Sequence, residues 1–184
     1  PAGVPPHRAT PSSSGTHRLA MLHRALDGEA RVEIDERELN RSGRSFMVDT
    51  LASVRAEIGA CEPLVFALGM DAYLTLSTWH EWEALADYAH VVALARPGAS
   101  PEPASDLASW EAGRTVPVDR LLETSAGNVA RVELSQVEVS ATAVREARGA
   151  GLAWRQGVPA GVAAYIEEHT LYVESARQTG CAAG

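Results

Sequence analysis

One short stretch of the sequence combines hydroxyl and basic side chains at the start of a predicted helix. Ser140, Thr142 and Arg145 follow a strand-like run and open a helical pattern. A helix start presents unpaired N–H groups and the positive end of the helix dipole, which both favour an anion. Hydroxyl donors and a guanidinium one turn further on suit a polyphosphate. A serine N-cap followed by a solvated arginine also fits, and from the pattern alone it is the more common case.

Two further polar positions follow predicted buried strands. Gly69 and Asp71 come directly after the apolar run 64–68, and Arg96 follows the run 91–95. In open α/β sheets, ligands gather beyond the carboxyl ends of the strands. At such a position a glycine allows a ligand to approach the backbone closely, and a carboxylate can accept a hydrogen bond from a ribose hydroxyl. The alternatives are a turn in which Asp71 caps the next helix, and a surface arginine at a strand end.

Hydrophobic periodicity supplies the elements that must position these residues. Helices are predicted over 19–26, 48–58, 80–88, 140–148 and around 162–166, with Ser45 capping the second and Gly59 ending it. Strands are predicted over 31–39, 64–68, 91–95 and 129–134, followed by a short extended piece over 171–173. The alternation predicts an α/β fold with a mainly parallel sheet flanked by helices. We expect a single domain over 1–173 and a disordered tail over 174–184.

Composition narrows the class of protein. The 184 residues are 46% hydrophobic and 22% charged, which is enough apolar material for a core. The formal net charge of −8 disfavours general binding of nucleic acid or of anionic membranes. The two cysteines, Cys61 and Cys181, are far apart, so a disulfide framework is not expected and a cytoplasmic location fits. No apolar run reaches membrane-spanning length.

A series of sequence blocks, taken in order, resembles the bacterial nicotinate-nucleotide adenylyltransferases. Among them are Ser45-Phe46-Met47-Val48-Asp49, Leu68-Gly69-Met70-Asp71, Thr78-Trp79-His80-Glu81-Trp82, Arg96-Pro97-Gly98 and Val139-Ser140-Ala141-Thr142-Ala143-Val144-Arg145. The resemblance begins at Pro1 and continues to about Tyr172. It implies a Rossmann-like nucleotidyltransferase that joins ATP and nicotinate mononucleotide, releases pyrophosphate and uses Mg²⁺. Such chemistry asks the protein mainly for positioning and charge neutralisation.

The same resemblance assigns roles to residues. It implies that Trp79 stacks on the nicotinate ring, that Arg96 meets the phosphate of nicotinate mononucleotide, and that Ser140, Thr142 and Arg145 bind ATP phosphates. His7-Arg8 resembles a segment near those phosphates, although a flexible basic terminus is a strong alternative explanation. Trp82, on the apolar face of the predicted helix, is expected to belong to the core. The other histidines show no metal-ligand spacing and are expected at the surface or between helices: His17, His23, His80, His90 and His169.

Met47 departs from the family pattern. The matching position is usually a threonine that helps hold the nicotinate carboxylate, and Phe46 stands where a tyrosine is usual. Met47 has no hydroxyl, but backbone N–H groups at this helix start could still bind a carboxylate. The hypothesis is that this chain discriminates less between nicotinate and nicotinamide nucleotides than its relatives do.

The family's opening strand and its histidine-containing, glycine-rich turn have no counterpart in the sequence. We therefore expect the first βαβ unit, on the order of 30 residues, to be absent, and with it any catalytic residue. We expect the chain alone to be inactive, and unstable or prone to aggregation. Two alternatives stay open: a non-catalytic nucleotide-binding remnant of this fold, and a sister adenylyltransferase for another phosphorylated substrate such as a pantetheine phosphate. Self-association into a homo-oligomer also stays open.

Overall fold

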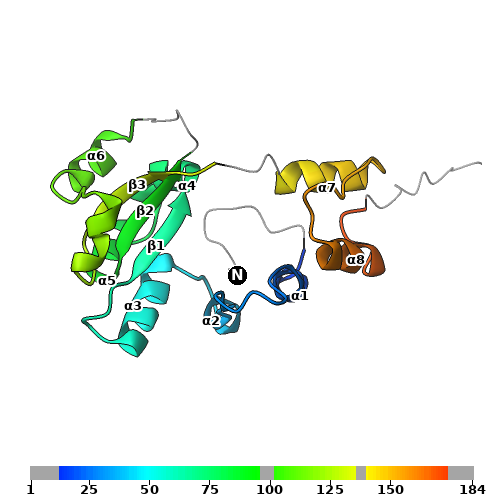
Figure 1. Ribbon diagram of the computed structural model, residues 1–184, viewed down its shortest axis with the longest axis horizontal. Helices are drawn as coiled ribbons and strands as arrows, with labels where there is room; N and C mark the ends of the chain where they lie inside the picture. The colour runs from blue at the N-terminus through cyan, green and yellow to red at the C-terminus, as the bar shows by residue number, and fades with distance from the viewer. Residues whose placement is uncertain (1–12, 96–101, 136–139, 174–184) are drawn as a thin grey trace, which may run out of the picture. The chain divides into compact units, whose positions relative to one another are not determined.

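The computed structural model describes residues 13–95, 102–135 and 140–173 (Figure 1). These residues form two compact units. The sheet unit comprises the described residues from 40 to 135, and the helical unit comprises the described residues of 13–39 and 140–173. The prediction of one domain over 1–173 stays a prediction, because each unit is described by itself. The predicted tail, 174–184, lies outside the described residues.

The sheet unit is built on three parallel strands in the order β1-β2-β3 (Figure 1). The strands are β1 (Val65–Gly69), β2 (His90–Ala95) and β3 (Val129–Glu133). Three of the four predicted strands are thereby confirmed. On β2, Val91 and Ala93 point to one apolar cluster and Val92 to another, so both faces of the sheet are covered. Burial on both faces is typical of parallel sheets and explains why β2, the central strand, is almost wholly apolar, whereas β1 and β3 at the edges are partly exposed.

Short helices surround this sheet. They are α3 (Met47–Ile58), α4 (Met70–Leu74), α5 (Leu85–Tyr88) and α6 (Ser105–Glu111), with 3₁₀ segments at Leu76–Thr78, Trp82–Ala84 and Val118–Glu123. The core residues Tyr73, Leu76, Leu85 and Leu107 come from these elements and are at most 1% exposed. The helix predicted over 80–88 is wrong in its first half, because Glu81 adopts left-handed backbone angles that interrupt it.

The helical unit contains α1 (Gly15–Ala25), α7 (Ala141–Gly149) and α8 (Ala160–Glu168), as predicted. Trp154, Ala163 and Ile166 form its core. The predicted extended piece over 171–173 is wrong: Thr170 and Tyr172 have φ values of 50° and 60°, which turn the chain instead of extending it.

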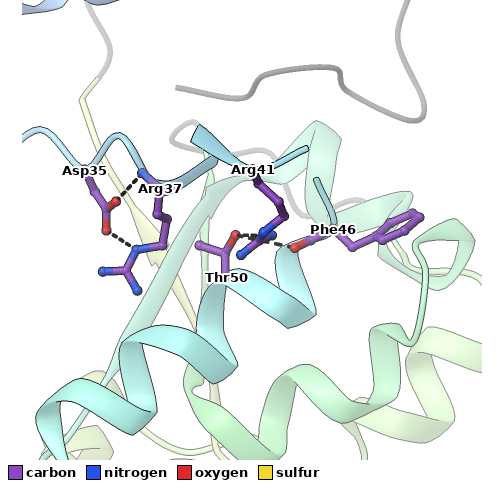
Figure 2. A network of polar contacts seen from close by, with 5 residues as sticks. All are labelled: Asp35, Arg37, Arg41, Phe46 and Thr50. Atoms are coloured by element: carbon purple, nitrogen blue, oxygen red, sulfur yellow. Dashed lines mark hydrogen bonds and ion pairs between the residues drawn. The ribbon is translucent and has the colours of Figure 1, made fainter. Parts of the chain in front are cut away.

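The strand predicted over 31–39 is also wrong. Residues 32–36 have no regular structure, and the short helix α2 (Arg37–Asn40) follows. The side chain of Asp35 accepts hydrogen bonds from the backbone N–H of Arg37 at 2.8 Å and from its Nε at 2.5 Å (Figure 2). Such local bonds compete with strand pairing and favour a turn into a helix. The alternation of Val32 and Ile34 with charged residues was therefore a misleading signal.

Candidate functional site

Gly69 ends β1 at the carboxyl edge of the sheet, and Asp71 lies in the first turn of α4. Both residues are exposed. A Cβ added to Gly69 would meet no atom within 4 Å, so the space beside this backbone is open. Asp71 does not cap the helix, because the N-cap is Gly69 itself. The capping alternative is therefore wrong, and the Asp71 carboxylate remains at the surface beyond the strand end, where ligands bind in such sheets.

Trp79 and the start of α3, two parts of the predicted nicotinate site, are brought together in the sheet unit. Trp79 follows the 3₁₀ turn at Leu76–Thr78, is partly buried and packs against the core, 6.3 Å between ring centres from Phe66 of β1. His80, the next residue, lies 4.2 Å between ring centres from Phe46, the residue before Met47. This contact places the segment that carries Trp79 beside the start of α3.

A polar network fixes the start of α3 (Figure 2). The hydroxyl of Thr50 donates to the Phe46 carbonyl at 3.4 Å, and Arg41 donates to the same hydroxyl at 3.4 Å. Arg41 also lies 3.8 Å from the Asp49 carboxylate. The predicted Ser45 cap is wrong, because Phe46 is the N-cap residue and its side chain makes no capping hydrogen bond. The backbone at Met47 is therefore held by the Thr50 and Arg41 bonds, and not by a capping side chain of the N-cap residue.

The start of α7, in the helical unit, carries the predicted phosphate-binding residues. Ser140 is the N-cap, and its side chain accepts from the N–H of Ala143 at 3.3 Å. Arg145 donates to the Thr142 hydroxyl at 3.1 Å, so its guanidinium lies back over the first turn. This brings a cation to the positive end of the helix dipole. A bound anion would reduce the repulsion between the two positive charges. The cap interpretation is confirmed for Ser140, and it is compatible with anion binding.

Three predicted site residues, His7, Arg8 and Arg96, lie outside the described residues. Within 13–95, 102–135 and 140–173, no group of three His, Cys, Asp or Glu side chains is arranged to hold a metal ion. In the same ranges, no helix is long and apolar enough to cross a membrane.

His90 does not lie at the surface or between helices, contrary to the prediction. It is fully buried on β2, where its Nδ1 accepts from the Asn128 N–H at 3.1 Å. Its Nε2 must then carry the proton, which it donates to the Thr124 carbonyl at 2.9 Å. His90 is therefore a structural residue that ties β2 to the loop before β3.

Sequence reasoning missed the roles of Phe46 and His80, whose rings join the start of α3 to the Trp79 segment. It also missed Arg41 and Thr50, which hold that helix start. The one available signal was the spacing of Phe46 and Thr50, which lie one helical turn apart.

These features define a class: a parallel-sheet α/β protein with candidate ligand groups at the carboxyl edge of the sheet and at a helix start. Residues 1–147 match the cytidylyltransferase-like family. A probable nicotinate-nucleotide adenylyltransferase of Pseudomonas aeruginosa (strain UCBPP-PA14) is 45% identical over 172 residues, covering 94% of this chain and 80% of the relative. Another from Pseudomonas putida (strain W619) is 41% identical over 172 residues, covering 94% and 78%. The chain belongs to the nicotinate-nucleotide adenylyltransferases of the cytidylyltransferase-like family.

Solved structures support the fold. The Plasmodium falciparum nicotinic acid mononucleotide adenylyltransferase complexed with APC matches with a TM-score of 0.60 and 14% identity, covering 87% of this chain and 76% of that one. The same protein complexed with NaAD gives the same TM-score. The predicted Rossmann-like nucleotidyltransferase fold is thus confirmed. The predicted absence of a first βαβ unit stays a prediction.

Proposed function

We propose that this protein transfers the adenylyl group of ATP to nicotinate mononucleotide, forming deamido-NAD and pyrophosphate. A phosphate oxygen of the mononucleotide attacks the α-phosphorus of ATP, and the bond from that phosphorus to the pyrophosphate oxygen breaks. The 45% identity to a probable nicotinate-nucleotide adenylyltransferase, over 94% of the chain, is the observation that carries this proposal.

The sheet unit supplies the groups proposed for nicotinate mononucleotide. The face of Trp79 stacks on the pyridine ring, and the backbone at the start of α3, including Met47, receives the carboxylate. The contact between Phe46 and His80 supports this assignment, because it holds the two elements next to each other. Arg96 is proposed to pair with the phosphate of the mononucleotide.

For ATP, the proposed groups are the helix start at Ser140 and Thr142, with Arg145 neutralising phosphate charge. Asp71 accepts from a ribose hydroxyl beside Gly69, and His7 and Arg8 are proposed to lie near the phosphates. Mg²⁺ enters with ATP, since Mg²⁺ usually binds through substrate phosphates and few protein ligands. A cytoplasmic location is part of the proposal and rests on the cysteine usage.

The test measures two quantities on the same protein: deamido-NAD formation from ATP and nicotinate mononucleotide, and the dissociation constant for nicotinate mononucleotide. Trp79→Ala should raise that constant by roughly 5- to 150-fold, which corresponds to about 1–3 kcal/mol of lost stacking. Trp82→Phe is the matched control, because Trp82 packs on the core and on Trp110, 5.3 Å between ring centres.

Three outcomes separate the alternatives. Product formation supports the enzyme. Binding of both substrates without product supports the non-catalytic nucleotide-binding alternative and the expectation that the chain alone is inactive. Failure to bind nicotinate mononucleotide, with binding of another phosphorylated acceptor such as a pantetheine phosphate, supports the sister adenylyltransferase and overturns the proposal.

A further inference from the structure

A buried tyrosine, a buried carboxylate and an arginine meet inside the sheet unit. Tyr73 of α4 is fully buried, and Glu111, the last residue of α6, is 8% exposed. Arg131 of β3 donates to both carboxylate oxygens of Glu111, from Nε at 2.9 Å and from the terminal nitrogen at 2.7 Å. The guanidinium carbon lies 5.8 Å from the centre of the Tyr73 ring. One cluster therefore connects α4, α6 and β3.

The ring of Tyr73 lies beside this ion pair, within cation–π distance of the Arg131 guanidinium. Burial and the nearby Glu111 carboxylate raise the pKa of Tyr73, so the hydroxyl keeps its proton. It has no hydrogen-bond partner among the described residues. The link from Glu111 to Tyr73 therefore runs through Arg131, whose guanidinium pairs with the carboxylate and lies over the tyrosine ring.

The position of Tyr73 matters because Asp71 lies on the same short helix. Residues two positions apart on an α-helix point in nearly opposite directions, since each residue turns about 100°. Asp71 is exposed and Tyr73 is buried, as this geometry requires. α4 has only five residues and its N-cap, Gly69, provides no capping side chain. So short a helix has little stability of its own, and its orientation depends on what anchors its buried side.

We propose that Glu111 is a positioning residue for nucleotide binding: it holds the Arg131 guanidinium against the Tyr73 ring and thereby sets the direction in which Asp71 projects at the end of β1. The inference rests on the proposed function, in which Asp71 binds a ribose hydroxyl. Glu111 itself does not contact the nucleotide and acts only through Tyr73 and Asp71.

The experiment compares Glu111→Gln with two controls: Tyr73→Phe, which keeps the ring that Arg131 contacts, and Glu123→Gln. Glu123 is a matched control, because its carboxylate also binds an arginine, Arg120, but at the surface. Amide hydrogen exchange of residues 70–74 should speed up in Glu111→Gln and stay unchanged in both controls. The dissociation constant for ATP should rise about tenfold in Glu111→Gln, a loss of about 1.4 kcal/mol.

Combining Glu111→Gln with Asp71→Asn distinguishes a positioning effect on Asp71 from general structural damage. With Asp71 already altered, Glu111→Gln should weaken ATP binding no further, because its effect acts through that carboxylate. An equal additional loss in this background, or unchanged exchange of residues 70–74, would overturn the inference. If the unaltered protein binds neither ATP nor nicotinate mononucleotide, the proposed function fails and the inference with it, whereas normal binding without the predicted coupling refutes the inference alone.

Discussion

Arg55 of α3 connects four segments of the sheet unit through backbone carbonyls. Its guanidinium donates to the Tyr88 carbonyl at 3.0 and 2.7 Å and to the Ser125 carbonyl at 2.8 Å. It also donates to Gly59 at 2.9 Å and to Glu62 at 2.5 Å. All of these acceptors lie in loops or at helix ends, so a single side chain holds the connections between helices and strands together.

Replacing Arg55 with methionine should destabilise the protein measurably. Methionine keeps an apolar stem of similar length but removes every donor. Water can reach the exposed carbonyls of Gly59 and Glu62, so only the part-buried bonds to Tyr88 and Ser125 count. Ser125 retains a bond from the Leu64 N–H, and the Tyr88 carbonyl loses its charged donor. The two donations to Tyr88 share one carbonyl, so at about 1.5 kcal/mol for each of the two carbonyls the loss is about 3 kcal/mol.

Thermal and urea unfolding measure this loss. For a chain of this length, about 3 kcal/mol lowers Tm by roughly 6–12 °C. The Tm of Arg55→Lys should lie between those of the unaltered protein and Arg55→Met, because an ammonium cannot reach both buried carbonyls. Arg31→Met is the control, since the Arg31 side chain is 89% exposed and should change stability by no more than about 0.5 kcal/mol. If Arg55→Met stays within about 0.5 kcal/mol of the unaltered protein, the reasoning is refuted.

Three further predictions concern other sites. Met47→Thr should increase the preference for nicotinate over nicotinamide mononucleotide, measured as the ratio of kcat/KM or of dissociation constants; a strong preference already present with Met47 would contradict the hypothesis. Because the pKa of Tyr73 is raised on folding, its stabilising contribution is complete below about pH 10 and is lost at higher pH. Urea midpoints from pH 8 to 11 should therefore fall less steeply in Tyr73→Phe, and parallel curves would count against this. Ser140→Ala should destabilise the helical unit by about 1 kcal/mol through loss of the cap to Ala143, and ATP binding measured beside it shows whether the hydroxyl has a second role.

The sequence predicted those elements whose signal is local and strong. The short apolar runs of β1 and β2 predict strands of a parallel sheet, and β2 is buried on both faces as expected, whereas β1 is partly exposed. The two mistaken extended segments had weaker signals. Over 31–39 the alternation of apolar and charged residues looked like a half-buried strand, but the Asp35 side chain captures the N–H of Arg37 and turns the chain into α2. Asp35 was visible in the sequence as a residue type that makes such turns, and its effect outweighed the alternation.

The candidate site likewise contains residues that the sequence could predict and residues that it could not. Ser140 was predictable, because its capping role depends on a residue only three positions away. The contact between Phe46 and His80 was not, since it joins two elements that are brought together only when α3 and the Trp79 segment pack on one core. The pair of Glu111 and Arg131 is harder still: the partners are 20 residues apart, and β3 must lie next to β2 in the observed parallel register before Arg131 reaches α6. A buried carboxylate needs a cationic partner to remain charged. The burial of Glu111 therefore follows from the sheet order, and sequence periodicity alone could not have predicted it.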